Sequence, residues 1–288
     1  MPTLRLRFCL TLCLITPLLL SPVPRSACSQ QSAPLTKDQE DARDALNQGV
    51  QAFKNAQFEE AERLFARAKQ LDPTLVNAPL YLATAYASQY IPGAPSEEIV
   101  QKGKMAAQEY RQVLDRHPEN LSAIDGLASI LYQMAGQPFS SALFEESKSY
   151  HKKHIELRPN DPQPYYSVGV IDWALAYRAN TQLRAEFNKS VGGTGLRDTD
   201  PLPEFLRREY VQQFGSIVDE GIAMLRRAME LKSEYDDAMT YLNLLYRRKA
   251  DMAETPSGRE EFNKMADAML DEVMKVKQDR ARRSQPND

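Results

Sequence analysis

Two histidines, His151 and His154, are three residues apart, a spacing that places both imidazoles on one face of a helix. Imidazole is a common zinc ligand, and Glu145 or Glu146 could add a carboxylate. No cysteine is close to this pair in the sequence, and two lysines separate the histidines. We therefore interpret both histidines as packing residues of a helix, and we predict no metal site and no cofactor.

A glycine-rich run at 192–195 and the acidic residues after it have the types needed for phosphate binding or acid–base catalysis. The run lacks the Gly-Lys-Ser/Thr of a phosphate-binding loop, and no predicted strand precedes it. Asp198, Asp200 and Glu204 lie in a proline-rich segment, and we interpret them as solvated residues at the start of the next helix. Because the sequence offers no nucleophile–histidine arrangement, we predict that the protein is not an enzyme.

The composition is that of a globular protein with enough apolar residues for a core. The chain has 288 residues, of which 42% are hydrophobic and 26% charged, and its net charge is −3. Proteins that bind nucleic acid usually carry a strongly basic face. The acidic balance therefore argues against a nucleic-acid partner.

The first 28 residues have the pattern of an export signal. Arg5 and Arg7 precede a mostly apolar run from Phe8 to Leu20. As a helix this run would reach ~20 Å, less than the ~30 Å hydrocarbon core of a bilayer. We therefore predict a signal peptide over residues 1–28 instead of a membrane-spanning helix.

The end of this segment resembles a bacterial lipoprotein signal, in which a cysteine becomes the acylated first residue. Cys28 follows Ser26 and Ala27, although Arg25 stands where such signals usually have an aliphatic residue. Cleavage after Ser29 is the alternative. We expect an exported, periplasmic protein, anchored to the outer membrane by lipid if Cys28 is acylated, with a polar tether over residues 29–40.

A helical-hairpin pattern recurs along the rest of the chain and is clearest at Ala42–Leu75. In this copy Gly49 and Ala61 are small, Phe65 is large, and Pro73 ends the unit. The pattern resembles the tetratricopeptide repeat family. The resemblance implies an all-α solenoid, in which each hairpin buries its apolar face against the next.

About five such hairpins are predicted, at about 42–75, 76–120, 121–161, 162–235 and 236–275. The solenoid is expected to cover 41–278, followed by a frayed tail at 279–288. Long insertions separate the two helices within repeats two to five, the longest at 176–215. These insertions either contribute to a binding surface or only enlarge the core.

The resemblance also implies a concave groove lined by the first helix of each repeat. Transferring the family positions gives these candidate partner-binding residues: Leu46, Val50, Phe53, Lys54, Asn77, Leu80, Thr84, Ser129, Tyr132, Gln133, Tyr166, Val170, Trp173, Thr240 and Arg247. Gln163, Asp125 and Arg248 occupy further such positions. We expect the aromatic members to anchor a peptide or protein segment. Trp173 could instead pack beneath the long insertion.

The predicted function is a non-catalytic scaffold of the bacterial cell envelope that binds a peptide or protein partner in the groove. Some relatives grip a carboxylate with Lys and Asn, but here the equivalent positions hold Leu46, Val50, Ser122 and Gly126. One alternative is an envelope ligand-binding protein or hydrolase with a site formed by the 176–215 insertion. Another is a cytosolic adaptor. The sequence does not indicate the partner's identity or the oligomeric state.

Overall fold

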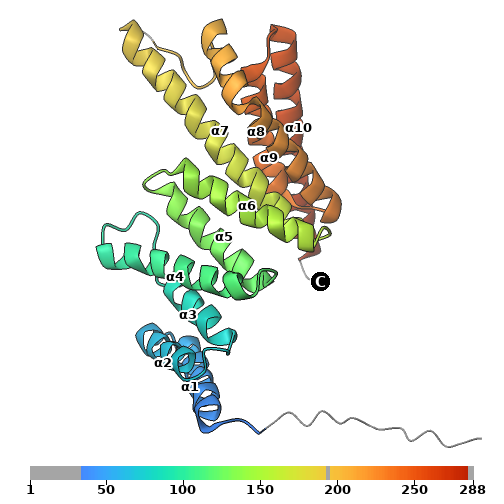
Figure 1. Ribbon diagram of the computed structural model, residues 1–288. Coiled ribbons are helices and arrows are strands. Elements are labelled where there is room, and N and C mark those ends of the chain that lie inside the picture. The colour runs from blue at the N-terminus through green and yellow to red at the C-terminus, as the bar shows by residue number, and fades with distance from the viewer. Residues whose placement is uncertain (1–33, 193–194, 285–288) are drawn as a thin grey trace, which may run out of the picture. The chain divides into compact units, whose positions relative to one another are not determined.

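The computed structural model describes residues 34–192 and 195–284, which form ten α-helices and no strand (Figure 1). The signal peptide and Cys28 lie outside these residues. In chain order the helices are α1 (Lys37–Lys54), α2 (Phe58–Leu71), α3 (Asn77–Ala87), α4 (Glu97–Arg116), α5 (Leu121–Gly136), α6 (Ser141–Leu157), α7 (Pro162–Val191), α8 (Glu204–Leu231), α9 (Asp236–Met252) and α10 (Pro256–Arg283).

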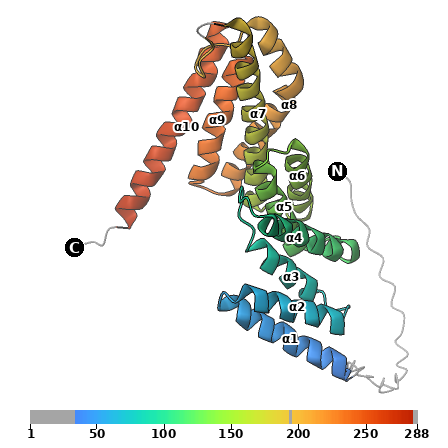
Figure 2. The same ribbon diagram turned by 90° about the vertical axis from the view of Figure 1, so that its left-hand side faces the viewer.

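The helices form five antiparallel hairpins that pack in sequence order, from α1 and α2 to α9 and α10 (Figures 1 and 2). Each second helix also packs against the first helix of the next hairpin. Several first helices contact one another as well, α1 with α3, α3 with α5 and α7 with α9. The predicted all-α solenoid is therefore confirmed.

Polar caps and prolines set many of the helix boundaries. Thr36 begins α1 with a reciprocal capping box to Gln39, and Asp161 begins α7 by accepting the backbone N–H of Gln163 at 2.9 Å. Helices α2, α4 and α6 each end just before an X-Pro pair, where the residue before proline disfavours helix. The prolines at these three places are Pro73, Pro118 and Pro159.

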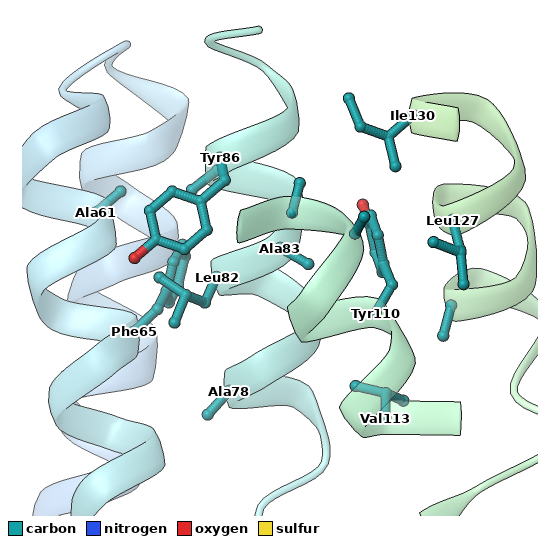
Figure 3. Packing of buried hydrophobic residues seen from close by; sticks show 14 of the residues in the cluster. Ala61, Phe65, Ala78, Leu82, Ala83, Tyr86, Tyr110, Val113, Leu127 and Ile130 are labelled. Atoms are coloured by element: carbon teal, nitrogen blue, oxygen red, sulfur yellow. The ribbon is translucent and has the colours of Figure 1, made fainter. Parts of the chain in front are cut away.

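Small and large side chains interlock where neighbouring helices meet. Figure 3 shows Ala61, Phe65, Leu82 and Tyr86 packed together, with Tyr110 beside Leu127 and Ile130 further along the array. A Cβ at Gly49 would lie only 2.6 Å from the Phe65 ring, so glycine lets α1 approach α2. The first large core covers α1 to α5 and the second covers α7 to α10.

The longest insertion consists mainly of extra helix. Helix α7 continues to Val191 and α8 begins at Glu204, so the connection within the predicted 176–215 insertion spans only 192–203. Gly192 ends α7 with a positive φ of 56°, a conformation that favours glycine. The extended part is stabilised by apolar packing of Leu183 and Phe187 in the second core.

The solenoid differs from the prediction at both ends. Helix α1 begins at Lys37, inside the predicted tether, because Thr36 caps it. Helix α10 continues to Arg283, inside the predicted frayed tail. In this segment Arg283 pairs with Glu234 at 2.6 Å and Arg280 pairs with Asp236 at 2.9 Å.

Candidate functional site: an aromatic cavity between the third, fourth and fifth hairpins

A cavity of about 400 Å³ lies between the last three hairpins. Helices α5 and α7 supply most of its lining, α6 adds two histidines, and α9 adds Tyr241. The lining residues are Asp125, Ser129, Tyr132, His151, His154, Asp161, Gln163, Pro164, Tyr166, Ser167, Val170 and Tyr241.

Helix periodicity explains why these side chains converge. In α5, Asp125, Ser129 and Tyr132 follow one another at intervals of four and three residues, which keeps them on one face. Tyr166 and Val170 have the same relation in α7. Because the hairpins stack in sequence order, these faces meet at one place.

The cavity unites part of the predicted groove. Ser129, Tyr132, Tyr166 and Val170 line it, as do the transferred positions Asp125 and Gln163, although the Val170 side chain is buried. Tyr241 lines it from α9, whereas the predicted Thr240 is exposed and donates its hydroxyl to the backbone oxygen of Asp236.

The other predicted groove residues lie elsewhere. Leu46 is buried in the first core, and Val50, Phe53 and Leu80 are partly buried against that core. Three of the predicted groove residues make intramolecular polar contacts: Thr84 donates to the Leu80 backbone oxygen, Gln133 donates to Ser129, and Arg247 forms an ion pair with Asp267. Lys54 and Asn77 are exposed.

Five aromatic rings form a continuous row along α7 and α9, and we call them the aromatic row: Tyr235, Tyr166, Tyr241, Trp173 and Tyr177. Their successive ring centroids are 5.1, 5.8, 5.2 and 5.3 Å apart. Trp173 thus packs between Tyr241 and the start of the extended hairpin at Tyr177. These distances are typical of favourable aromatic pairs.

The tyrosines of the cavity are neutral phenols. Burial raises the pKa of Tyr132, Tyr166 and Tyr241 above the ordinary value, and nearby tyrosines or the Asp237 carboxylate add to the effect. Each ring therefore offers an uncharged aromatic surface and a hydroxyl that can donate a hydrogen bond.

A histidine joins two carboxylates at one side of the cavity. Nδ1 of His154 lies 2.5 Å from Asp125 in α5, and its Nε2 lies 3.3 Å from Asp161, the residue that caps α7. Burial, followed by the neighbouring His154, lowers the pKa of His151 to about 4, so His151 is neutral near pH 7. In the described part of the chain, no group of three or more His, Cys, Asp or Glu residues could hold a metal ion.

Also in α6, Lys148 is buried beside Asp172 of α7. Lys148 Nζ lies 3.0 Å from Asp172, 3.0 Å from Glu145 and 3.5 Å from Glu220 of α8. Burial raises the pKa of Asp172 to about 7, even though Lys148 favours the carboxylate. This ion cluster links three helices and does not line the cavity.

The extended part of the fourth hairpin positions a second buried ion cluster. The Asp251 carboxylate of α9 accepts from Arg184 of α7 at 3.2 Å and from Arg259 of α10 at 3.1 Å, and Arg248 lies 3.1 Å away. Burial lowers the pKa of Arg184 and raises that of Asp251, with their mutual attraction opposing both effects. The cluster fixes the extension against the fifth hairpin.

Sequence reasoning missed several residues of the cavity. Tyr241 is one residue away from the transferred position Thr240, and Tyr235 precedes α9. The repeat pattern identifies His154 only as a packing residue. Asp161 followed by Pro162 is typical of a helix start. This signal could have predicted that Asp161 lies close to the end of the preceding helix.

None of the helices in the described residues is both long and apolar enough to cross a bilayer.

The fold resembles solved tetratricopeptide-repeat structures. The structure "MamA 41-end from Desulfovibrio magneticus RS-1" matches with a TM-score of 0.55 and 14% identity over 83% of this chain and 97% of the other. A second, "Crystal structure of MamA protein", matches with a TM-score of 0.56 and 12% identity over 86% and 98%.

A third structure is "Crystal structure of YrrB: a TPR protein with an unusual peptide-binding site". It matches with a TM-score of 0.52 and 16% identity over 83% of this chain and 88% of the other. No protein-family model and no curated protein matches the sequence. The class defined by fold is therefore that of the tetratricopeptide-repeat solenoids, and at these identities the likeness concerns the fold alone.

Proposed function

We propose that this protein is a non-catalytic scaffold of the bacterial cell envelope that binds a segment of another protein in the aromatic cavity. The observation that carries the proposal is the convergence of Tyr132, Tyr166 and Tyr241 from three hairpins on one cavity. Tyrosine supplies a large contact area with few rotatable bonds, which makes it frequent at binding hot spots. YrrB, which has the same fold and is described as having an unusual peptide-binding site, agrees with this use of the architecture.

The cavity suits a segment of a chain better than a whole protein surface. A volume of about 400 Å³ holds a few side chains. Exposed polar residues at the rim, Ser129 and Gln163, could bond the backbone of an extended segment. Apolar burial against the rings would supply most of the binding free energy.

A photo-crosslinking experiment tests this function. A photoreactive amino acid replaces Gln163 at the rim of the cavity, or Asp115, which is exposed on α4 and does not line it. We expect a discrete protein adduct in the source cells from position 163 and none from 115. Adding Tyr166→Ala and Tyr241→Ala should cost roughly 2 kcal/mol or more of binding, about thirtyfold in Kd, and remove the adduct.

The control for the tyrosine variants is Phe205→Ala, which removes an exposed ring of α8 outside the cavity. Circular dichroism would verify that each variant keeps its helices. An adduct that survives the double tyrosine replacement would place partner binding outside the cavity.

The envelope location is supported by the pattern of residues 1–28. Mass measurement of the mature N-terminus separates its two forms. An acylated Cys28 would indicate a lipid anchor, and an unmodified terminus at Gln30 would indicate a free periplasmic protein. Recovery of the chain with an intact Met1 from the cytosol would contradict export.

A further inference from the structure

The charged side chains that line the cavity are mainly acidic. Its lining includes the carboxylates of Asp125 and Asp161 and no lysine or arginine. His154 bridges the two carboxylates, and even a protonated imidazole would leave the three groups with a net negative charge. Asp237, exposed in the first turn of α9, adds a negative charge beside the tyrosines.

The chain places its own cations at both ends of the aromatic row. Lys232 lies over the Tyr235 ring with its nitrogen 4.0 Å from the centroid, and Arg248 lies 6.0 Å from the centroid of Tyr177. Among the described residues, no lysine or arginine makes a cation–π contact with the three tyrosines that line the cavity, Tyr132, Tyr166 and Tyr241. The middle of the row therefore combines aromatic surface with negative charge.

Other charged groups nearby do not reverse this balance. Lys148 and Lys152 of α6 are paired with Asp172 and Glu220, away from the cavity. Arg158 lines a shallower adjoining cavity that shares Asp125, His154 and Asp161. Its guanidinium donates to the backbone oxygen of Leu157 at 3.2 Å and keeps its positive charge, which offsets only part of the charge of Asp125, Asp161 and Asp237.

We propose that the cavity recognises a lysine or arginine side chain of the bound segment, held between the tyrosine rings and the carboxylates of Asp125 and Asp161. This inference rests on the proposed peptide-binding function and specifies the chemistry of the partner. An aromatic ring attracts a cation through its quadrupole, most strongly where water is partly excluded. An acidic segment would be repelled by Asp125, Asp161 and Asp237, whose negative charge Arg158 offsets only in part, and is therefore disfavoured.

A peptide-display selection on the full-length chain, with random twelve-residue peptides, provides the probe. We expect the selected peptides to be enriched in lysine or arginine and to lose binding in the Tyr166→Ala, Tyr241→Ala double variant. Binding of a selected peptide is then titrated by the fluorescence of Trp173, the single tryptophan of the chain, whose ring lies 5.2 Å from Tyr241.

The decisive comparison removes charge with little change of shape. In the peptide, arginine becomes citrulline or lysine becomes norleucine. In the protein, Asp125→Asn and Asp161→Asn are combined, with Asp115→Asn as the matched control on α4. We expect each charge removal to weaken binding about tenfold, and the two together to weaken it by less than the product of the separate effects. The control should leave the affinity unchanged.

Two results would overturn the inference. Peptides that require Tyr166 and Tyr241 but bind equally well after the citrulline or norleucine replacement would leave the peptide-binding function intact and refute the choice of a basic side chain. Failure to select any peptide that depends on the two tyrosines would remove the proposed function and this inference together.

Discussion

At the scale of single residues, the buried carboxyl group of Asp172 has a strongly raised pKa. Its side chain is fully buried, one oxygen bonds Lys148 at 3.0 Å, and the other has no hydrogen-bond partner. Loss of hydration disfavours the charged form, and the lysine only partly restores it. The pKa of Asp172 is therefore raised from an ordinary value of 3.8 to about 7.

This shift predicts how stability depends on pH. Because the folded state holds the proton more tightly than the unfolded state, the contribution of Asp172 to the free energy of unfolding is largest below pH 4 and falls as the pH rises to about 7. Asp172→Asn removes the titration. In urea unfolding, the free energy of unfolding of wild type minus that of this variant should fall by roughly 3 kcal/mol between pH 4 and pH 7.

The variant Asp115→Asn, which replaces an exposed residue of α4 and keeps Asp172, is the control and should retain the loss of stability that Asp172 causes between pH 4 and pH 7. A wild-type curve parallel to that of Asp172→Asn would show that Asp172 titrates at its ordinary value.

At the scale of elements, glycine sets how closely the two helices of the long hairpin approach. A Cβ at Gly169 of α7 would lie 2.4 Å from a carbon of Leu225 in α8 and 3.2 Å from the backbone oxygen of Gly221. The backbone contact cannot be relieved by a rotamer change. Gly221 in turn lies against Leu245 and Asp172, so any shift of α8 would disturb α9 and the buried ion cluster.

We predict that Gly169→Ala destabilises the protein by about 1–3 kcal/mol, because it overpacks the α7–α8 contact. Gly136→Ala is the matched control. It is the last residue of α5, has no atom within 4 Å of the added Cβ, and should be neutral or stabilise by up to about 1 kcal/mol. Thermal unfolding measures both. An equal effect of the two replacements would contradict the close α7–α8 approach.

The small, large and helix-ending residues of a single hairpin can be recognised in the sequence, and their spacing predicts the fold. Gly49, Phe65 and Pro73 each act within one repeat, so their spacing identifies the unit and its stacking. The length of α7 is harder to predict, because its extension depends on Arg184 meeting Asp251, a residue far away in the sequence. Helix periodicity places Tyr132 and Tyr166 on inner faces, but it does not reveal that they share a cavity.

The cavity itself depends on contacts between hairpins. His154 joins Asp125 and Asp161 across three helices. Tyr241 lies beside Trp173 because α7 and α9 contact each other. Neither juxtaposition has a signal in the spacing within one repeat. For this reason the sequence predicts which faces are available for binding and not which residues form the site.

At the scale of the whole molecule, the solenoid has two large cores joined by a small one. The first core covers α1 to α5 and the second covers α7 to α10. Between them, Phe144 of α6 packs with Ala135, Ile171 and Leu175. In a stacked array each repeat is stabilised by its neighbours, so the weakest interface determines whether the array unfolds as one unit.

We predict that Phe144→Ala divides the unfolding of the solenoid into two steps. The replacement should cost about 3–5 kcal/mol at the buried Phe144 site, whose relative exposure is only 5%. Because this site belongs to the junction, the loss uncouples the two large cores instead of weakening either one. Trp173 fluorescence then reports the C-terminal core in urea, and hydrogen exchange of α1 to α4 reports the N-terminal one.

In wild type the two probes should unfold at one urea midpoint, and in Phe144→Ala at two. Phe139→Ala removes a ring 5.5 Å from Phe144 that is 38% exposed, so it should cost much less and keep one midpoint. A single, lowered midpoint in Phe144→Ala would mean that the cluster does not control coupling. Other contacts across the same junction, such as the Lys148–Asp172–Glu220 ion cluster, would then have to keep the two halves coupled.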